Sequence, residues 1–311
     1  MILVAAPGAL IALVSLAAFL GRWVWWLDVL ANFRAQYFVI LTVTGLVVVL
    51  SHWRNLGYGI LGAALVNLVF VLPLYLGSPG AADPAAPSIT VMSFNLLSTN
   101  QSFAGVIDYI DDEDPDLVFL HEASRPWEVA MESSALAYRI IRPRSDDMVF
   151  GTLVLVRQQE VEAVSHGFGA AQPRAVEVTY RPRGWPQPIQ VLSTHPLAPT
   201  NAERASLRDA QIRFAADWAE GREGAVVVVG DLNATPWSWP FRLLTGTGLR
   251  NSQHGFGLQA SFPTTALFLM RVPIDHLLVS GELGVRERYL GPSLGSDHFP
   301  LVVDLELKDD T

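Results

Sequence analysis

Side chains that can bind metal ions or transfer protons recur at the ends of short apolar runs after residue 88. In chain order they are Asn95 in ITVMSFN, Glu122 in LVFLHE, His195 in VLSTHPLAP, Asp231 and Asn233 in VVVVGDLNATP, Asp275 in PIDHLLVS, and Asp297 and His298 in GSDHFPL. Carboxylate and amide oxygens suit hard cations such as Mg²⁺ or Mn²⁺, whereas a zinc site would use more nitrogen or sulfur. The set therefore predicts a site for a hard divalent cation with histidines beside it.

Each of these residues also has an ordinary structural explanation. A single Asp or Asn after a strand is commonly a turn former or a helix cap, and Asn233 fits the start of a helix in this way. A single His beside an apolar run is commonly an edge residue with a satisfied hydrogen bond. A purely structural role explains Glu122 less well, because an apolar run precedes it and a buried carboxylate needs a partner. Taken together, the set favours a functional site.

The elements that would position these residues are short strands alternating with helices. Strands are predicted at residues 89–95, 117–122, 152–156, 175–180, 189–193, 225–229, 274–279 and 300–305, and helices at 103–112 and 126–137. A capping box from Thr200 to Glu203 opens a further helix that ends near Glu220. This order predicts an α/β (α+β) domain in which two sheets pack face to face between helices. The polar residues would meet at the strand ends and in the loops beyond them.

The first 77 residues have a different composition from the rest. Only Arg22, Asp28, Arg34 and Arg54 are charged there, which leaves 47 charged residues for the other 234 positions. Three uncharged apolar stretches are present, at residues 2–20, 35–51 and 58–76, and about 20 apolar residues cross a bilayer. Tryptophans at 23, 25, 26 and 53 lie at the ends of these stretches, where interfacial aromatics are expected. The sequence therefore predicts a three-helix transmembrane segment over residues 1–77.

The first stretch has a competing interpretation as a cleaved signal peptide. It lacks a basic region before its apolar run and two further apolar stretches follow it, so a retained span is favoured. Residues 78–88, with the sequence GSPGAADPAAPS from residue 77, are predicted to be a linker. The catalytic domain is expected at residues 89–307, and residues 308–311 form a tail.

Orientation in the membrane does not follow from charge alone. With three spans, the loop from Arg22 to Arg34 lies on the side of the C-terminal domain, and Arg54 and the amino terminus lie on the other side. After Arg54 no basic residue follows until Arg125, which mildly favours export of the large domain.

Charge and cysteine content exclude several classes of function. Residues after 77 include 18 basic and 29 acidic side chains, with Lys308 the only lysine, and such a surface repels polyanions. A broad DNA-gripping surface is therefore not expected, although a local group of arginines could hold one phosphate. The chain has no cysteine, which excludes disulfides, thiol catalysis and cysteine-ligated metal centres.

The order SFN, LHE, STHPLAP, GDLNATP, IDHLLVS and GSDHFPL resembles the endonuclease/exonuclease/phosphatase (DNase I-like) superfamily over nearly all of residues 89–307. The resemblance implies a four-layered αββα sandwich and a hydrolase that cuts phosphate esters with Mg²⁺ or Mn²⁺. It also implies that Glu122 is the principal metal ligand, with Asn95 and Asp297 close by.

The same resemblance implies catalytic roles for five residues. Asp231 would orient or deprotonate the attacking water, and Asn233 would hold the phosphoryl oxygens. His298 would contact the phosphate with its tautomer fixed by Asp275, a pairing that also makes physical sense. His195 would lie opposite as a phosphate contact or general acid.

Three features depart from the family pattern. His121 stands where the family usually has Gln, so the hydrogen bonds around Glu122 are expected to differ. A partner that orients His195 is not evident from the sequence. The basic surface of the repair nucleases is also missing, which weakens a nuclease assignment.

The three-span anchor resembles the membrane-bound branch of this superfamily associated with vancomycin and teicoplanin resistance. That resemblance implies an extracytoplasmic domain and a lipid-linked phosphate or pyrophosphate as substrate. Residues 266–270 (ALFLM), with Trp237 and Trp239, could form an apolar rim for a lipid tail, or they could be a core strand and helix-packing tryptophans. Three hypotheses follow: a membrane-anchored lipid phosphoesterase whose partners are this substrate and the bilayer, an anchored nuclease or nucleotide phosphodiesterase, and a non-catalytic binding or sensor domain.

Overall fold

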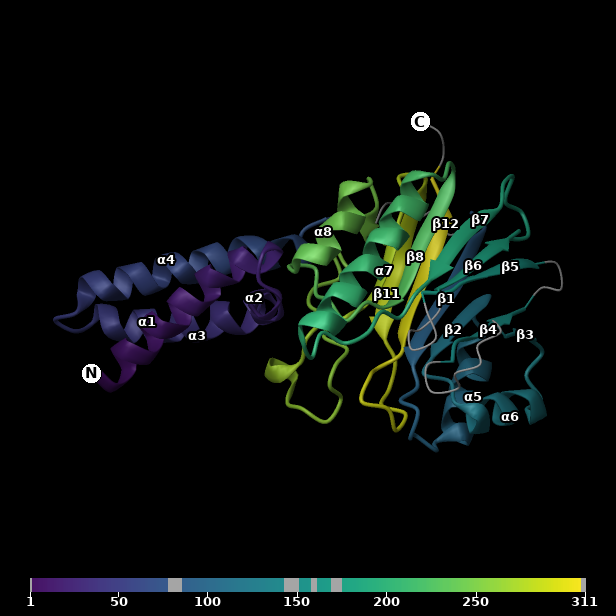
Figure 1. Ribbon diagram of the computed structural model, residues 1–311, viewed down its shortest axis with the longest axis horizontal. Helices are drawn as coiled ribbons and strands as arrows, with labels where there is room; N and C mark the ends of the chain where they lie inside the picture. Colours follow the sequence, from purple (N-terminus) through teal and green to yellow (C-terminus); the bar gives the residue numbers. More distant parts are fainter. Residues whose placement is uncertain (1, 78–85, 143–150, 158–160, 169–174, 309–311) are drawn as a thin grey trace.

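The computed structural model describes residues 2–77, 86–142, 151–157, 161–168 and 175–308 (Figure 1). Most of the predicted linker lies outside these residues, and so does the tail after Lys308. The strands all lie between Ser88 and Leu307, and the chain before residue 77 is helical.

The strands form two sheets of six, with the orders β11–β12–β1–β2–β4–β3 and β5–β6–β7–β8–β10–β9. The first sheet contains β1 (Ser88–Asn95), β2 (Leu117–His121), β3 (Arg139–Ile141), β4 (Leu153–Val156), β11 (Leu283–Leu290) and β12 (Leu301–Leu307). The second contains β5 (Val161–His166), β6 (Ala175–Tyr180), β7 (Ile189–Ser193), β8 (Ala225–Asp231), β9 (Arg250–Asn251) and β10 (Asp275–Val279).

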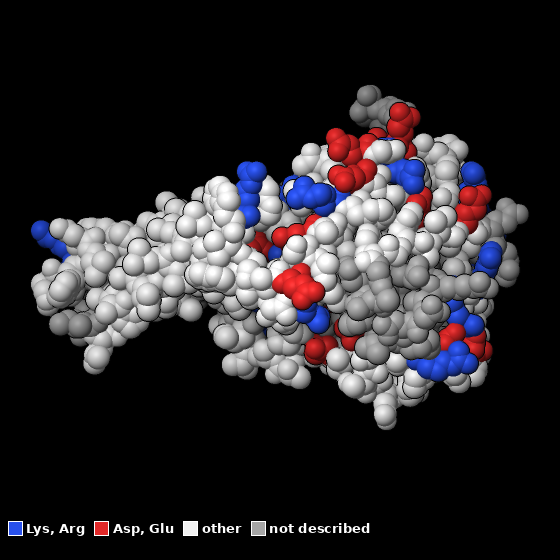
Figure 2. Space-filling model, in the orientation of Figure 1, with Lys and Arg blue, Asp and Glu red and all other residues white. Residues whose placement is uncertain are grey.

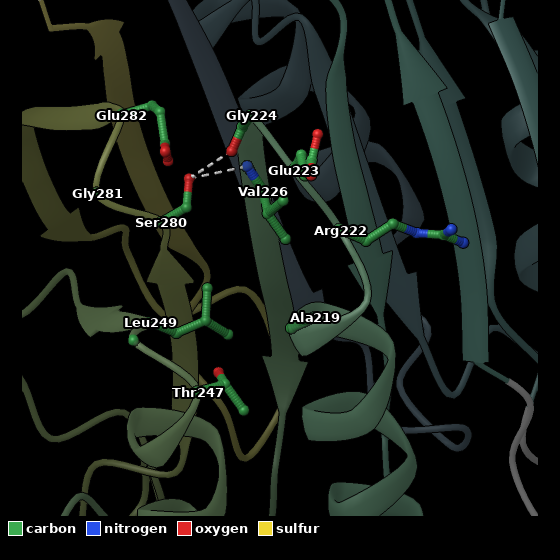
Figure 3. Close-up of a pocket in the computed structure, with 11 residues that line it drawn as sticks. Ala219, Arg222, Glu223, Gly224, Val226, Thr247, Leu249, Ser280, Gly281 and Glu282 are labelled. Atoms are coloured by element: carbon green, nitrogen blue, oxygen red, sulfur yellow. Dashed lines mark hydrogen bonds between the residues drawn. The ribbon is translucent and has the colours of Figure 1, made fainter.

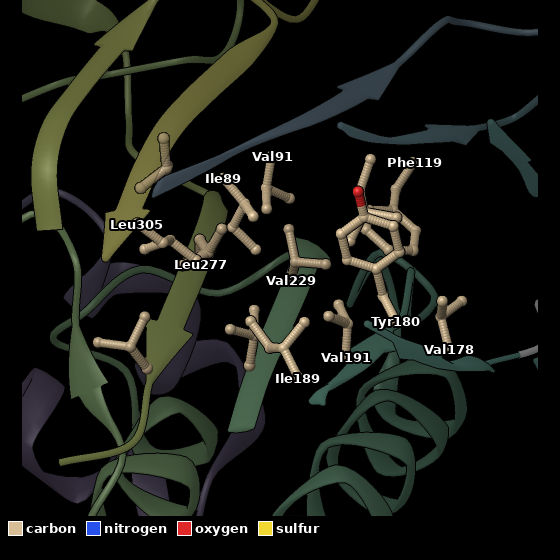
Figure 4. Close-up of a cluster of buried hydrophobic side chains, with 14 of the residues drawn as sticks. Ile89, Val91, Phe119, Val178, Tyr180, Ile189, Val191, Val229, Leu277 and Leu305 are labelled. Atoms are coloured by element: carbon tan, nitrogen blue, oxygen red, sulfur yellow. The ribbon is translucent and has the colours of Figure 1, made fainter. Parts of the chain in front are cut away.

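An apolar core fills the space between the two sheets (Figure 4). Val91 and Phe119 of the first sheet lie in it with Val191 and Val229 of the second, all fully buried. Because alternate side chains of a strand point to opposite faces, neighbouring residues such as Met92 pack outward against helices instead. The inner faces are therefore joined by the hydrophobic effect, the main favourable term in folding.

Helices cover both outer faces of the pair of sheets (Figure 1). Helices α5 (Phe103–Glu113) and α6 (Arg125–Ser133) pack on the first sheet, and α7 (Ala202–Glu220) and α8 (Trp239–Gly246) pack on the second. The four-layered sandwich predicted from the sequence is confirmed. The cap of α7 is Asn201, whose side chain accepts a hydrogen bond from Arg204 N, and not Thr200, whose N–H is used in a turn with Ala198 O.

Strand direction brings the polar residues to one edge of the sandwich. In the centre of each sheet two strands are parallel, β1 with β2 and β7 with β8, so their carboxyl ends lie side by side. Strands β12 and β10 run antiparallel to β1 and β8, so they bring their amino ends to the same edge. Residues just after four strands and just before two others thus meet there.

The N-terminal helices form a bundle that projects from one side of the sandwich (Figure 1). They are α1 (Ile2–Ala17), η1 (Ala18–Arg22), α2 (Trp25–Ala31), α3 (Arg34–Val49), α4 (Arg54–Val71) and η2 (Leu72–Leu74). The bundle is nearly free of charged atoms, whereas charges gather over the sandwich (Figure 2).

Two helical stretches of the bundle are long and apolar enough to cross a membrane, Leu3–Arg22 and Arg54–Leu74. The third predicted span passes the same test only if α2 and α3, which meet at 66°, count as one bent span. The chain between Arg22 and Arg34, expected to be a loop, contains helix α2, because Asp28 and its neighbours pack against the sandwich.

Candidate active site

A pocket of about 190 Å³ opens where the strand ends converge. It contains seven of the eight residues singled out from the sequence, and Asp275 lies directly behind one of them, His298. The lining residues are Asn95, Glu122, His195, Leu197, Ala198, Arg204, Asp231, Asn233, Phe262, Asp297 and His298. The structure therefore brings together residues that are up to 203 positions apart in the sequence.

Glu122 follows strand β2 with its backbone in the left-handed region, at a φ of 52°. Residues other than glycine adopt this conformation at a cost of about 1–3 kcal/mol, and such strain gathers at functional sites. Its carboxylate accepts hydrogen bonds from Asn95 Nδ2 and from Ser98 N, both at 3.2 Å. The turn thus aims a partly exposed carboxylate into the pocket.

Asn95 ends strand β1 between two carboxylates. Its Nδ2 donates to Glu122 Oε1 at 3.2 Å and to Asp231 Oδ2 at 3.1 Å, while its Oδ1 accepts from Leu97 N. The nitrogen end of the amide, not the oxygen end expected of a metal ligand, thus faces the carboxylates. The two ends of an amide have nearly the same shape, so a half-turn of the terminal torsion would present Oδ1 to a cation at the same place.

Asp297 precedes strand β12 and is half buried. Its pKa is raised, first by burial and then by the carboxylates of Glu122 and Asp231, while His298 lowers it. Carboxylates that converge on one pocket repel each other, and a divalent cation relieves that repulsion. An all-oxygen set of this kind fits Mg²⁺ or Mn²⁺.

Asp231 ends strand β8 and is buried. Burial alone would raise its pKa, but the charges of His298 and His195 and a hydrogen bond from Asn233 N outweigh this and hold the pKa below its ordinary value. Asn233 N donates to Asp231 Oδ1 at 2.9 Å, and Asn233 Nδ2 donates to Pro196 O at 3.0 Å. Asn233 has a φ of 49°, so a second non-glycine residue of the pocket has a left-handed backbone.

Gly230, just before Asp231, lies against the chain of the neighbouring strand end. A Cβ atom at this position would collide with the carbonyl oxygen of Thr194, and its φ of 141° is rare for residues with a side chain. Glycine is therefore required where β8 passes His195 and delivers Asp231 to the pocket.

His298 lies between two carboxylates. Its Nδ1 hydrogen-bonds Asp275 Oδ2 at 2.8 Å, and its Nε2 lies 3.6 Å from Asp231 Oδ2. Burial lowers the pKa of the imidazole, but Asp275 and Asp231 together raise it to about 10. His298 is therefore a cationic donor at neutral pH, with its orientation fixed by Asp275 as expected.

His195 lies on the opposite side of Asp231. Its Nε2 is 3.4 Å from Asp231 Oδ2, and the attraction and hydrogen bond of Asp231 raise its pKa against the lowering effect of burial. Its Nδ1 has no hydrogen-bond partner among the described residues. The ring also packs 5.5 Å from that of His121, centroid to centroid, so the contacts with Asp231 and His121 together orient it.

His121 departs from the family pattern and lies behind the pocket rather than in it. It is fully buried, its Nε2 is 3.4 Å from Ser193 Oγ, and burial together with the charge of His195 lowers its pKa to about 3. It is therefore a neutral packing group beside His195.

Asp231, Asp275 and His298 also lie close enough to hold a metal ion, with one ligand atom from each within 4.8 Å of the others. In the described arrangement, however, His298 Nδ1 is already engaged with Asp275. We therefore interpret this cluster as a carboxylate–imidazole pair beside Asp231, and the oxygen-rich side of the pocket as the place for a cation.

Three residues of this region had no role in the sequence analysis. Arg204 lines the pocket and is its one basic side chain besides the histidines, and its Nε donates to Ala198 O at 3.0 Å. Phe262 stacks at 4.8 Å on the ring of His298. His276 Nε2 hydrogen-bonds Ala234 O at 2.8 Å and so supports the segment after Asn233. Only His276 had a visible signal, its position next to Asp275.

A larger hollow, of about 340 Å³, lies at the other end of strand β8 (Figure 3). Ser280 Oγ spans it with hydrogen bonds from Val226 N and to Gly224 O, and Arg222 points away toward Glu177, which it contacts at 2.7 Å. Its described lining has no histidine or aspartate. Its ionisable side chains are Arg222, Glu223 and Glu282, in contrast to the aspartates and histidines of the smaller pocket.

Comparisons with known proteins agree with this geometry. A model described as the endonuclease/exonuclease/phosphatase family matches residues 92–298. No curated protein sequence gives a significant match.

Many solved structures share the fold. Humanized TDP2 of D. rerio has a TM-score of 0.60 and 17% identity, over 70% of this chain and 99% of its own. An endonuclease/exonuclease/phosphatase family protein from Bacteroides thetaiotaomicron has a TM-score of 0.57 and 17% identity, over 72% and 99%. The human Nocturnin catalytic domain with bound sulfate has a TM-score of 0.55 and 20% identity, over 71% and 94%.

Because the family model covers more than half of the chain and the strand-end residues converge as its motifs require, the chain belongs to the endonuclease/exonuclease/phosphatase family. It is accordingly a metal-dependent hydrolase of phosphate ester bonds.

Proposed function

We propose that the chain is a membrane-anchored phosphoesterase that uses Mg²⁺ or Mn²⁺ to hydrolyse a lipid-linked phosphate or pyrophosphate. The observation that carries the proposal is an apolar crevice shared by the membrane helices and by the loop over residues 262–272, which begins at the active site.

The crevice has a volume of about 620 Å³ and an almost entirely apolar lining. Helices α3 and α4 form one wall, with Phe38, Ile40 and Leu68, and the loop forms the other, with Phe268 and Leu269. A space of this size between apolar helices and an apolar loop suits a hydrocarbon chain, because burial of each CH₂ group contributes about 0.8 kcal/mol.

The loop joins this crevice to the pocket. At its base Phe262 and Val272 exchange backbone hydrogen bonds, Phe262 lines the pocket, and Thr264 N donates to Asp297 O. At its tip Leu267 is 81% exposed and Leu269 is 63% exposed. The ALFLM segment is therefore not the core strand of the alternative interpretation, and its exposed apolar side chains are of the kind that contact lipid.

The helices also hold the loop in place. Gln36 of α3 donates from its Nε2 to Arg271 O at 2.8 Å. Arg271 in turn donates to the carbonyls of Thr264 and Ala266 and stacks on Phe299. The loop thus connects the two sites, so a lipid chain bound in the crevice would have its phosphate end near the pocket.

Trp237 and Trp239 do not lie in the apolar rim that was one of the two interpretations of the sequence. Trp237 is buried against the end of α4 and donates from its Nε1 to Phe70 O at 2.8 Å. The ring of Trp239 lies 4.7 Å from the guanidinium of Arg22. Both tryptophans join the sandwich to the helices and do not line the crevice.

Glu122, Asp297 and Asn95 would hold the cation. The cation would supply positive charge against the negative charge that develops on the phosphorus oxygens, usually a large term in such catalysis. Arg204 would add a fixed positive charge at the pocket wall.

The remaining residues would handle the water and the phosphate. Asp231 has a pKa below its ordinary value and is therefore a weak base. This favours a role in orienting the attacking water over a role as the general base that accepts its proton. The amide of Asn233 and the protonated ring of His298 would donate to phosphoryl oxygens. His195, on the other side of Asp231, would donate to the phosphate or to the leaving oxygen.

Nucleic acid is the alternative substrate, since one structural neighbour is D. rerio TDP2 complexed with a single-strand DNA product. The acidic balance of the chain, a net charge of −9, works against it, because nucleic-acid affinity draws on basic side chains that meet phosphates. The lipid proposal therefore has the stronger support.

We place the catalytic domain on the extracytoplasmic side of a multi-pass anchor. The support is the absence of any basic residue in the sequence between Arg54 and Arg125, since cytoplasmic flanks of spans are rich in Lys and Arg. Protease added to intact cells and to inverted vesicles tests this, and cleavage of the domain only in inverted vesicles would contradict it.

Phosphate release by the detergent-solubilised full-length protein tests the function. The substrates are a polyprenyl pyrophosphate, a phospholipid with a terminal phosphate, and a plasmid, each with Mg²⁺ and with EDTA, and Asp231→Asn is the inactive control. Release from a lipid by the wild type alone, lost in EDTA, is the expected result. Nicked plasmid with both lipids intact would instead assign a membrane-anchored nuclease.

A further inference from the structure

The segment from Asn233 to Trp239, which follows the catalytic end of β8, is contacted by the N-terminal helices at several points. Thr235 Oγ1 donates to Asn32 Oδ1 at 3.0 Å, and Trp237 Nε1 donates to Phe70 O at 2.8 Å. Neither contact is needed to tether a domain to a membrane. Together they place the N-terminal helices against the active-site segment.

A buried ion pair connects the same two parts. Asp28 of α2 is 2% exposed, Arg208 of α7 is 1% exposed, and Arg208 Nη2 lies 2.8 Å from Asp28 Oδ2. Arg208 also contacts the partly exposed carboxylate of Asp209 at 2.8 Å, so removal of Asp28 takes away the buried partner of a buried guanidinium. Asp28 is also the one acidic residue among the first 77, where a charge is otherwise costly.

The pair reaches both ends of the active-site segment. Arg208 Nη1 donates to the backbone oxygen of Asn233 at 3.2 Å, and Asp28 Oδ1 accepts from Trp239 N, the first residue of α8, at 2.6 Å. Asn233 is one of the two strained residues of the pocket, with a φ of 49°. A strained conformation persists only where surrounding contacts determine it.

We propose that Asp28 and Arg208 are positioning residues that hold Asn233 and the segment 233–239 in the active conformation. The N-terminal helices are then a structural part of the active site and not a tether alone. The inference rests on the proposed role of Asn233 at the phosphate, but not on the identity of the substrate.

Asp28→Ala tests the proposal in the full-length protein, and Glu306→Ala is the matched control. Glu306 is likewise a buried carboxylate, paired with Arg286 at 2.5 Å, but it lies on β12 at the end away from the pocket. Both variants remove a buried carboxylate that is paired with an arginine, and only Asp28→Ala releases the segment. The assay substrate is a water-soluble phosphate diester, so that access of lipid does not enter the result.

We expect Asp28→Ala to lower kcat about 100-fold with KM changed less than about threefold, because a small misplacement of a positioning contact costs rate more than binding. Glu306→Ala keeps kcat near the wild-type value. Hydrogen exchange provides a second readout: amides of residues 232–240 exchange faster in Asp28→Ala and unchanged in Glu306→Ala.

Equal kcat and equal exchange of residues 232–240 in the two variants would overturn the proposal. If Asp28→Ala does not fold, Asp28→Asn decides on the same two readouts, since it keeps the volume and an acceptor for Trp239 N. If the wild type hydrolyses none of its substrates, the proposed function fails, and the exchange of residues 232–240 still tests the positioning role.

Discussion

Strand β8 runs between two hollows that differ in size and in lining. At its Asp231 end lies a pocket of about 190 Å³, and at its Ala225 end lies a hollow of about 340 Å³. The smaller one places the imidazoles of His195 and His298 at 3.4 and 3.6 Å from the carboxylate of Asp231. The larger one is lined mainly by glycines and short side chains, with one arginine and two glutamates.

The difference shows that volume is a poor guide to function in this fold. The pocket is distinguished by groups held at an unfavourable free energy. Two of its non-glycine residues have a positive φ, and its carboxylates and imidazoles are buried away from water. Among the described residues that line the hollow at the Ala225 end, only glycines have a positive φ. Groups held at an energetic disadvantage are typical of functional sites, so they favour the Asp231 end as the place of catalysis.

The largest expected effect is a loss of kcat that occurs only for substitutions at the Asp231 end of β8. Asp231→Asn and Glu122→Ala should each lower kcat at least about 10³-fold, because each removes a charge on which the reaction depends. Glu282→Gln, in the lining of the larger hollow, should leave kcat unchanged. Steady-state phosphate release measures all three, with circular dichroism as the test of folding. Near-normal turnover by Glu122→Ala would show that the cation is held elsewhere, for instance by Asp231, Asp275 and His298.

Much of the sandwich could be predicted because its central strands are apolar on both faces. Strands β6 and β7 have the predicted bounds, and β1 and β8 differ from them by one or two residues. Edge strands were missed: β5 reads VEAVSH and β11 reads LGVRERYL, where consecutive polar or charged residues interrupt the apolar pattern. Their pairing depends on neighbours in the sheet, which a local pattern does not contain.

The convergence of these residues on one pocket could be predicted because each one follows or precedes an apolar strand, but most of their contacts could not. The pairing of His298 with Asp275 is as expected. The reach of Arg208 to Asn233, the bond of Asn32 to Thr235 and the stacking of Phe262 on His298 all join distant segments. The bond of Asn32 to Thr235 arises from the docking of α2 on the sandwich, and in residues 22–34 only the charge of Asp28 hinted at that docking.

A smaller effect is expected from the residue that supports His298. Asp275→Asn removes the charge that raises the pKa of His298, so the ring is less often protonated at neutral pH and its tautomer is no longer fixed. We expect kcat to fall about 10²-fold, a typical contribution of a positioned acid or base. Kinetics from about pH 6 to pH 9 measure it. A variant with wild-type rates across this range would show that Asp231 alone holds the imidazole.

The crevice gives a still smaller effect, which depends on the substrate. Leu269→Ser should raise KM for a lipid-linked phosphate about tenfold, because apolar contact with the chain is lost, and should leave a water-soluble diester unaffected. Val164→Ser, at a similarly exposed apolar residue of β5, is the matched control. An equal change of KM for both substrates would show that the substitution alters the structure of the loop and does not remove a contact with lipid.

The last difference between the two ends is in proton binding. His276 is fully buried beside the Asp231 end, and burial lowers its pKa to about 3 from 6.5, although its hydrogen bond to Ala234 O opposes this. Between these values the unfolded chain binds more protons than the folded one, so the free energy of unfolding falls as pH falls below 6.5, by up to about 1.4 kcal/mol per pH unit for this residue.

His276→Gln removes this dependence and should reduce the stability lost between pH 6.5 and pH 5 by about 2 kcal/mol. Thermal unfolding at both pH values measures it, with Glu282→Gln at the other end as the control. If His276→Gln lost as much stability as the wild type on acidification, the imidazole would have to be protonated in the folded protein, and the bond to Ala234 O would then hold a charge next to the catalytic segment.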